Sequence, residues 1–476
     1  MEFSKKAGLF IGPILFLIIL NLPFDLISEK GDAVIGVATW MVIWWITEAV
    51  SISVTALLPL LLFPILKIMD IGEVGANYGS PIIFLFFGGF VLALALEKVN
   101  LHKRIALNII KLTGTTPNKV VLGFMIATAF LSMWISNTAT TVVMLPIAMS
   151  VISLLVNDAD GFTMSDKNFA LCVMLGIAFS ANAGGIATVI GTPPNSVMIG
   201  LLENEYNIEI SFLKWMVIGV PFATVMIWIS YLVLVKLMFP NKQLKFSASK
   251  DIINEELHKL GPMSGKEKMV LAIFGVTVFF WIFRTVINDI FPSLKLNDSI
   301  ISIAAAITMF SFPYNLKKAD FIIHWKDTQK LAWGILILFG GGLALAKGMS
   351  VSGIVDLVSS AIATSNISVL FTAILLITLM LFMTELMSNV ALTAVLAPVV
   401  AGIAIGLEIP ILYLLIPVTM ASSCAFMLPM ATPPNAIVFA SGYIKVNEMA
   451  RVGVVLNFIA IGLLILMFQF VIPFFF

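Results

Sequence analysis

Residues 133–146 read MWISNTATTVVMLP, and residues 385–398 read the related ELMSNVALTAVLAP. Their Ser-Asn pairs begin at Ser136 and Ser388, 252 positions apart (388 − 136). A Thr-Pro-Pro-Asn segment follows each stretch, at 192–195 and 432–435, and a Phe-Gly-Gly segment precedes each, at 87–89 and 339–341. Three matched pairs in the same order indicate an internal duplication of the chain.

The composition predicts an all-α polytopic membrane protein. Of the 476 residues, 60% are hydrophobic and 11% are charged, whereas soluble domains carry about 25% charged residues. Cys172 and Cys424 lie in apolar runs, and the three histidines form no metal-binding cluster. The chain has no Gly-x4-Gly-Lys-Ser/Thr motif, which argues against an ATP-driven pump. Nor does it show a catalytic constellation, so we expect neither an enzyme nor a nucleic-acid partner.

Apolar runs of roughly 20 residues predict membrane-spanning helices. Nine stretches read as single crossings: 8–24, 33–50, 51–68, 80–98, 212–238, 268–288, 298–313, 331–348 and 452–475. Residues 120–155 and 368–404 carry Ser-Asn at mid-length and read as re-entrant hairpins, which enter and leave on one side of the membrane. Residues 168–203 and 410–441 are interrupted by Thr-Pro-Pro-Asn and read as broken helices. This gives about eleven transmembrane helices and two hairpins.

The basic residues favour a cytoplasmic N-terminus and an extracytoplasmic C-terminus. With that orientation, 20 of the 27 basic residues fall on the cytoplasmic side, and two, Lys98 and Arg284, lie at or within spans. Only five fall outside: Lys30, Lys67, Lys214, Lys295 and Lys347. Hairpins that crossed fully would give thirteen spans with the same orientation, so the charges leave that alternative open. With eleven spans the two copies are inverted relative to each other, an arrangement typical of secondary transporters.

The polar breaks predict an ion-binding and anion-binding centre. A Pro-Pro pair cannot continue a helix, so each break creates one helix C-terminus with free carbonyl groups and one N-terminus with free amides. The hairpin tips do the same. Free carbonyls with Ser, Thr and Asn oxygens suit a hard monovalent cation such as Na⁺, whereas helix N-termini suit a carboxylate.

These paired motifs, which extend over essentially the whole chain, resemble the divalent anion/sodium symporter family of di- and tricarboxylate transporters. The resemblance implies a homodimer in which a transport domain slides as an elevator against a scaffold domain. The scaffold would comprise residues 1–118 and 241–366, and the transport domain residues 119–240 and 367–476. It also implies a cytoplasmic-membrane location, Na⁺ as the coupled ion and no organic cofactor.

The resemblance also implies the site residues. Its first sodium site corresponds to Ser132, Ser136, Asn137 and Gly191, and its second to Thr384, Met387, Asn389 and Ala431. Substrate carboxylates would meet Asn137, Thr138, Thr192, Ser388, Asn389 and Thr432.

One departure from the family pattern concerns the second tip, where Val390 stands in place of the usual threonine. The side chain has nearly the shape of threonine but lacks its hydroxyl group. The paired sites predict Na⁺-coupled symport of C4-type dicarboxylates (succinate, malate, fumarate or 2-oxoglutarate class), whereas Val390 suggests Na⁺-independent dicarboxylate exchange as the alternative. An anion channel is the least favoured reading, because paired hairpins and midplane breaks do not make a continuous polar pore.

Overall fold

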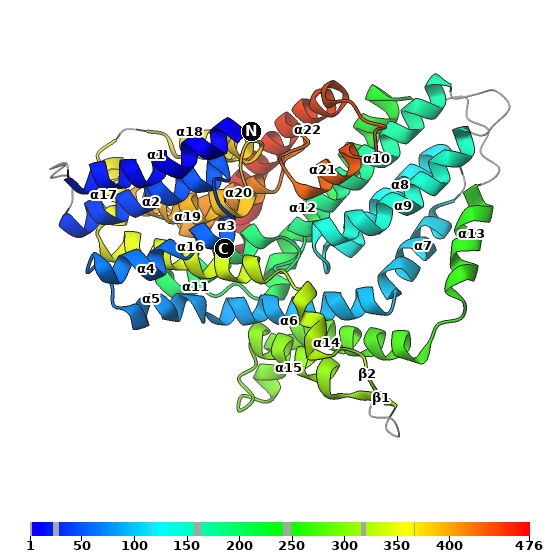
Figure 1. Cartoon of the computed structure of the whole chain (residues 1–476), viewed down its shortest axis with the longest axis horizontal. Coiled ribbons are helices and arrows are strands. Elements are labelled where there is room, and N and C mark those ends of the chain that lie inside the picture. Colours follow the sequence, from blue (N-terminus) through cyan, green and yellow to red (C-terminus); the bar gives the residue numbers. More distant parts are fainter. Residues whose placement is uncertain are drawn as a thin grey trace.

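The structure is a computed structural model that describes residues 2–21, 28–114, 116–156, 163–240, 249–315, 320–365 and 367–476 (Figure 1). Helices make up most of the described chain. The helices of the first half are α1 (Glu2–Asn21), α2 (Glu29–Thr47), α3 (Ile52–Thr55), α4 (Leu58–Ile65), α5 (Ile71–Tyr78), α6 (Pro81–Lys98), α7 (Leu101–Thr113), α8 (Pro117–Ser132), α9 (Asn137–Val156), α10 (Met164–Ile186), α11 (Pro193–Tyr206), α12 (Phe212–Leu232) and the π-helix η1 (Val233–Met238).

The second half begins with a polar connection and repeats the helical pattern. Its elements are α13 (Ser249–Leu260), α14 (Gly265–Ile290), α15 (Asp298–Ser311), β1 (Pro313–Asn315), β2 (Asp320–Phe321), the 3-10 helix η2 (Trp325–Lys330), α16 (Trp333–Val351), α17 (Ile354–Ala363), α18 (Val369–Thr384), α19 (Asn389–Gly406), α20 (Ile411–Ser422), α21 (Pro433–Phe439), α22 (Val446–Leu466), the π-helix η3 (Met467–Val471) and α23 (Ile472–Phe475).

Matched helix bounds support the internal duplication. Helix α18 begins and ends 252 residues after α8 (369 − 117 and 384 − 132). Helix α22 begins and ends 234 residues after α12 (446 − 212 and 466 − 232). Both α12 and α22 continue into a π-helix at their C-terminal ends. The two halves therefore share a backbone irregularity as well as sequence motifs.

Seven helices in the described chain are long and apolar enough to cross a membrane, so the polytopic class is clear. The count of eleven spans stays a prediction, because several of the expected spans are shorter helices. The expected span 51–68 consists of α3 and α4. Pro59 explains this interruption, because its ring conflicts with the carbonyl of the fourth residue before it, Thr55, where α3 ends.

The expectation of an entirely helical chain missed one small antiparallel pair. Strand β1 pairs with β2 through Pro313 opposite Phe321 and Asn315 opposite Asp320. The pair lies between α15 and η2 in the chain, and Figure 1 shows it beside α14 and α15.

The two halves interlock at the centre of the molecule. Helix α9 of the first hairpin packs against α10 and also against α21, which belongs to the second broken helix. In the same way, α19 of the second hairpin packs against α20 and α11. Each broken helix therefore contributes one half to its own repeat and one to the other, which brings both tips and both breaks together.

The Phe-Gly-Gly segments allow close helix packing around this centre. Helix α6 packs on α15, and α16 packs on α4 and α5. A Cβ atom on Gly88 would overlap Ser302, and one on Gly341 would overlap the Ala56 carbonyl. These glycines therefore serve helix contact, since only a residue without a side chain allows such an approach.

Two ion pairs tie the amphipathic helix α7 to α13 and to the first turn of α14. Arg104 on α7 donates to the Glu267 carboxylate at 2.6 Å and to the Gly261 carbonyl at 2.9 Å. Lys103 lies 2.8 Å from Glu256 on α13. Hydrogen bonds from Lys103 and Lys259 hold the pKa of the Glu256 carboxyl below its usual value. Helix α7 is therefore anchored at its start.

Candidate functional site

A serine precedes the first helical residue at each hairpin tip. Ser136 accepts a hydrogen bond from the Ala139 amide at 3.2 Å at the start of α9. Ser388 occupies the N-cap position of α19, but its side chain makes no capping hydrogen bond. Serine is favoured there because its hydroxyl serves amides that have no partner within the helix. The first helical residues, Asn137 and Asn389, therefore present backbone amides that an α-helix leaves free.

The helix N-termini at the Thr-Pro-Pro-Asn breaks differ from the sequence prediction. Prolines stand at the first two helical positions of α11 and α21, so those N-termini lack the free amides that the sequence reading assigned to them. The asparagines bind back to carbonyls of the unwound segments. Asn195 donates to the Thr188 carbonyl at 2.8 Å, and Asn435 donates to the Leu428 carbonyl at 3.0 Å. Free amides at the centre therefore come from the two hairpin tips.

One cavity of about 550 Å³ brings these four polar segments together. It is enclosed by the starts of α9, α11, α19 and α21 and by apolar side chains of α2, α6 and α16. All six expected carboxylate ligands line it: Asn137, Thr138, Thr192, Ser388, Asn389 and Thr432. Their proximity fits the sequence reading, but their role as ligands stays a prediction.

Four neutral oxygens converge beside the first tip. The Ser132 hydroxyl lies 2.6 Å from Oδ1 of Asn137 and donates to the Ala181 carbonyl at 2.8 Å. The same end of the Asn137 amide lies 3.2 Å from the Ala181 carbonyl and 3.3 Å from the Gly191 carbonyl. An asparagine amide can present its oxygen or its nitrogen here. With the oxygen inward, the cluster is a donor set for a hard cation. With the nitrogen inward, the amide donates to these three groups, and this orientation satisfies both ends of the amide without an ion.

The expected first sodium set is therefore largely assembled. Ser132, Asn137 and Gly191 meet, while Ser136 caps α9 and lines the adjacent cavity. The Ala181 carbonyl belongs to the cluster and was not foreseen. Within the described residues, no group of three His, Cys, Asp or Glu side chains is placed to hold a metal ion. A cation at this place would be held by neutral oxygens.

The expected second set is more open. Met387, Asn389 and Ala431 line the cavity, while Thr384 is buried behind it. The Thr384 hydroxyl donates to the Ser422 carbonyl at 2.6 Å, much as Ser132 bonds Ala181 in the first repeat. Asn389 also lines the cavity. Among the described residues, its side chain has no hydrogen-bond partner, so both ends of its amide are free to bind a ligand.

Asn182 is a cavity residue that the sequence reading missed. It is 1% exposed and donates from α10 to Thr432 and to the Ala425 carbonyl, both at 3.1 Å. Its Oδ1 atom is buried without a partner. The available signal was a lone asparagine within the apolar run 169–190. This side chain ties the first broken helix to the break of the second.

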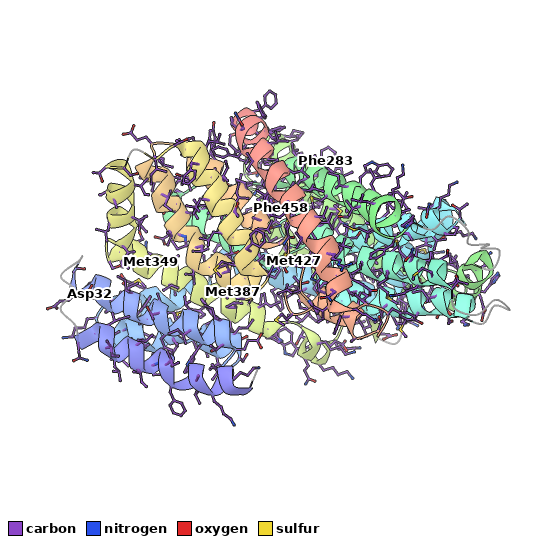
Figure 2. The ribbon with its side chains drawn as sticks, turned by 90° about the horizontal axis from the view of Figure 1, so that it is seen from above. Asp32, Phe283, Met349, Met387, Met427 and Phe458 are labelled. Atoms are coloured by element: carbon purple, nitrogen blue, oxygen red, sulfur yellow. The ribbon has the colours of Figure 1, made fainter. Side chains whose placement is uncertain are left out.

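Glu385 closes the second break. Its buried carboxylate accepts hydrogen bonds from the backbone amides of Phe426, Met427 and Leu428 and from the Asn457 side chain. The position 252 residues earlier is Met133 (385 − 252), so the first repeat has no such carboxylate. Figure 2 labels Met387, at the second hairpin tip, and Met427, in the second break, and both lie near the middle of the molecule. The carboxylate satisfies amides that the unwound segment would otherwise leave unpaired.

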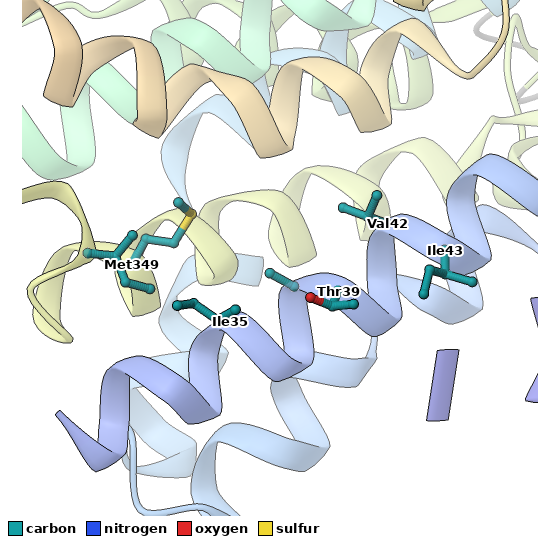
Figure 3. Close-up of a pocket in the computed structure, with 7 residues that line it drawn as sticks. Ile35, Thr39, Val42, Ile43 and Met349 are labelled. Carbon is teal, nitrogen blue, oxygen red and sulfur yellow. The ribbon is translucent and has the colours of Figure 1, made fainter. Parts of the chain in front are cut away.

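Two other cavities are poorly suited to an anion. One of about 240 Å³, between α2, Met349 and Ile354, offers a single polar side chain, that of Thr39 (Figure 3). Another, of about 290 Å³, is lined by three carboxylates and one guanidinium: Glu203, Glu209, Asp298 and Arg284. A dicarboxylate would gain little in the first and would be repelled by the second.

Comparisons with known proteins give matches over most of the chain. Residues 4–474 match the family described as "Sodium:sulfate symporter transmembrane region". A "Sodium-dependent dicarboxylate transporter SdcS" of Staphylococcus saprophyticus is 39% identical, with 99% of this chain and 92% of the relative covered. The protein of that name in Staphylococcus aureus has the same identity and coverage. The crystal structure of the YdaH transporter of Alcanivorax borkumensis has a TM-score of 0.56 at 11% identity, covering 84% of this chain and 87% of that one, which is a likeness of fold alone.

Proposed function

Because the chain belongs to the sodium:sulfate symporter family, a family of membrane transporters, we propose that it is a Na⁺-coupled symporter of C4-type dicarboxylates. The observation that carries this proposal is the 550 Å³ cavity, in which both helix N-termini of the hairpins meet neutral hydroxyl and amide side chains. Helix N-termini bind carboxylates through free amides and the positive end of the helix dipole. Two such ends from opposite repeats suit a substrate with two carboxylates.

Coupling to sodium is supported by the oxygen cluster at Ser132 and Asn137 and by the relatives named as sodium-dependent. A bound cation beside the cavity would offset the charge of the substrate and make anion binding depend on Na⁺. The exchange alternative, suggested by Val390, is not favoured by these relatives. Two cation sites, one in each repeat, remain our proposal.

We propose alternating access by an elevator movement in the cytoplasmic membrane. Lys5, Thr47 and Glu48 line the cavity on the side where the N-terminus lies. With the N-terminus in the cytoplasm, as the basic residues favour, the cavity is open inward. Movement of the hairpins and broken helices, residues 119–240 and 367–476, against the remaining scaffold would carry the site across. The homodimer also remains a proposal.

The deciding experiment is uptake of labelled succinate or malate into proteoliposomes. We expect uptake into empty vesicles that requires an inward Na⁺ gradient and is saturable in both Na⁺ and dicarboxylate. Vesicles loaded with dicarboxylate but without Na⁺ serve as the comparison. Uptake that ignores Na⁺ and needs internal dicarboxylate would instead establish exchange, and Ser132 and Thr384 would then be structural.

Val390 gives a prediction about substrate preference. It is 6% exposed and lines the cavity at the second helical position of α19, where the first repeat has Thr138. We expect Val390→Thr to change the KM for the preferred dicarboxylate by about tenfold or to reorder the substrates. The reason is that one added hydrogen bond to a charged group contributes about 1.5–3 kcal/mol.

The measurement is competition of succinate, malate, fumarate and 2-oxoglutarate against one labelled substrate. Val142→Thr is the matched control, since this valine on α9 is 53% exposed on the outside of the hairpin. An unchanged KM and ranking in Val390→Thr would mean that position 390 does not reach the substrate.

A further inference from the structure

Two charged residues stand at the entrance of the cavity. Among the described residues that line it, Lys5 and Glu48 are the only charged ones. The Lys5 ammonium lies 3.4 Å from a Glu48 carboxylate oxygen. They belong to α1 and to the end of α2, whereas the expected substrate ligands lie on the tips and breaks. The dicarboxylate reading assigns neither of them a role.

The backbone holds this pair in place. Glu48 ends α2 with a φ of 47°, a left-handed conformation that residues other than glycine adopt uncommonly. A Cβ atom on Gly8 would overlap the Thr47 side chain, so glycine lets α1 approach the end of α2 closely. Lys5 lies one helical turn before Gly8 and therefore on the same face of α1. The fold itself brings Lys5 beside Glu48.

The pair is too exposed to be a strong structural bond. The side chain of Lys5 is 40% exposed and that of Glu48 is 67% exposed. Exposed ion pairs contribute little to folding because water and salt screen them. Charges at the entrance of a low-dielectric cleft nevertheless act on an incoming ion, because such a cleft focuses the field. A dicarboxylate with two negative charges feels this field twice as strongly as a monovalent anion.

We propose that Lys5 and Glu48 form an electrostatic gate for the dianionic substrate on the cytoplasmic side of the cavity. Lys5 attracts the dicarboxylate as it enters, and Glu48 holds Lys5 when no substrate is present and opposes entry of the anion. The proposal rests on the proposed function and adds that the affinity for substrate on one face of the membrane is set outside the tips and breaks.

The two partners should act in opposite directions. Lys5→Gln removes the attraction, so the KM for dicarboxylate at the cytoplasmic face should rise by about fivefold. Glu48→Gln removes the competitor and the repulsion, so the same KM should fall by a similar factor. A pair that only fastened α1 to α2 would respond in one direction, because either substitution breaks the same contact.

The experiment compares both faces of the membrane. Inside-out membrane vesicles present the cytoplasmic face, and whole cells present the other. Each variant is measured for Na⁺-driven uptake of succinate at low ionic strength and with added choline chloride. Lys6→Gln is the matched control, because Lys6 is the neighbouring basic residue, is exposed and does not line the cavity. Wild-type uptake in the same vesicles tests the proposed function separately.

The expected result is a pair of opposite KM shifts, with little change in kcat, that occur only in inside-out vesicles and shrink as salt is added. Lys6→Gln should behave as wild type. Equal shifts on both faces, shifts of the same sign in both variants, or unchanged KM values beside normal wild-type transport would each overturn the gate. If the wild type itself transports no dicarboxylate, the proposed function fails and the gate fails with it.

Discussion

Replacing Asn137 with alanine should reduce Na⁺-driven dicarboxylate uptake by about 100-fold or more. Asn137 has two tasks in the structure, since its amide meets Ser132 and two carbonyls in the oxygen cluster and its own residue begins α9 at the cavity. Alanine keeps the helix but loses every contact of the amide. In the proposed site the amide also binds the Na⁺ and a substrate carboxylate. A contact to a charged group contributes about 1.5–3 kcal/mol, so losing both weakens binding by about 10² to 10⁴.

The measurement is initial uptake in proteoliposomes, normalised to the amount of monodisperse protein. Asn108→Ala provides the control, because Asn108 is exposed on α7 and bonds only the carbonyl of Arg104 on its own helix. The paired variant Asn389→Ala should mainly raise the KM for dicarboxylate, since that side chain faces the cavity without a protein partner. Normal uptake with normal Na⁺ dependence in a well-folded Asn137→Ala protein would remove this residue from the site.

The duplicated motifs were enough to predict which segments meet at the centre. Ser-Asn tips and Pro-Pro breaks follow from local chemistry, because serine caps a helix and proline cannot continue one. Their repetition in both halves predicted that one site would gather them, and the cavity contains all six expected carboxylate ligands.

What the sequence could not provide were contacts between segments without a repeated motif. Glu385 binds amides 41 to 43 residues away, and Asn182 reaches Thr432 across 250 residues. Neither side chain has a counterpart of the same type in the other repeat, so the duplication did not mark either residue as part of the centre. Lys5 and Glu48 meet only because α1 packs on α2, which hydropathy alone does not specify. Such residues are set by tertiary packing rather than by local propensity.

The second large effect concerns a glycine beside the oxygen cluster. A Cβ atom added to Gly185 would lie 2.5 Å from Oδ1 and 3.0 Å from Nδ2 of Asn137. Real Cβ atoms do not approach other atoms that closely, so the Asn137 amide must leave its position. The Gly185 carbonyl lies equally close to where a Cβ on Gly191 would be, so the surrounding backbone offers little room. We therefore expect Gly185→Ala to abolish Na⁺-dependent uptake.

We expect the Gly185→Ala protein to remain folded, so that a loss of uptake can be assigned to the site rather than to unfolding. Gly185 lies in the last turn of α10, where alanine is the better helix former by about 1 kcal/mol. Gly275→Ala is the matched control, because nothing lies within 4 Å of the added methyl group there. The measurement is the Na⁺ dependence of uptake together with thermal stability of the purified protein.

Unchanged Na⁺ affinity in Gly185→Ala would show that the oxygens around Asn137 hold no coupling ion. Loss of Na⁺-dependent uptake in a stable protein would show that transport requires the Asn137 amide in its present position, since the added methyl group contacts that amide most closely.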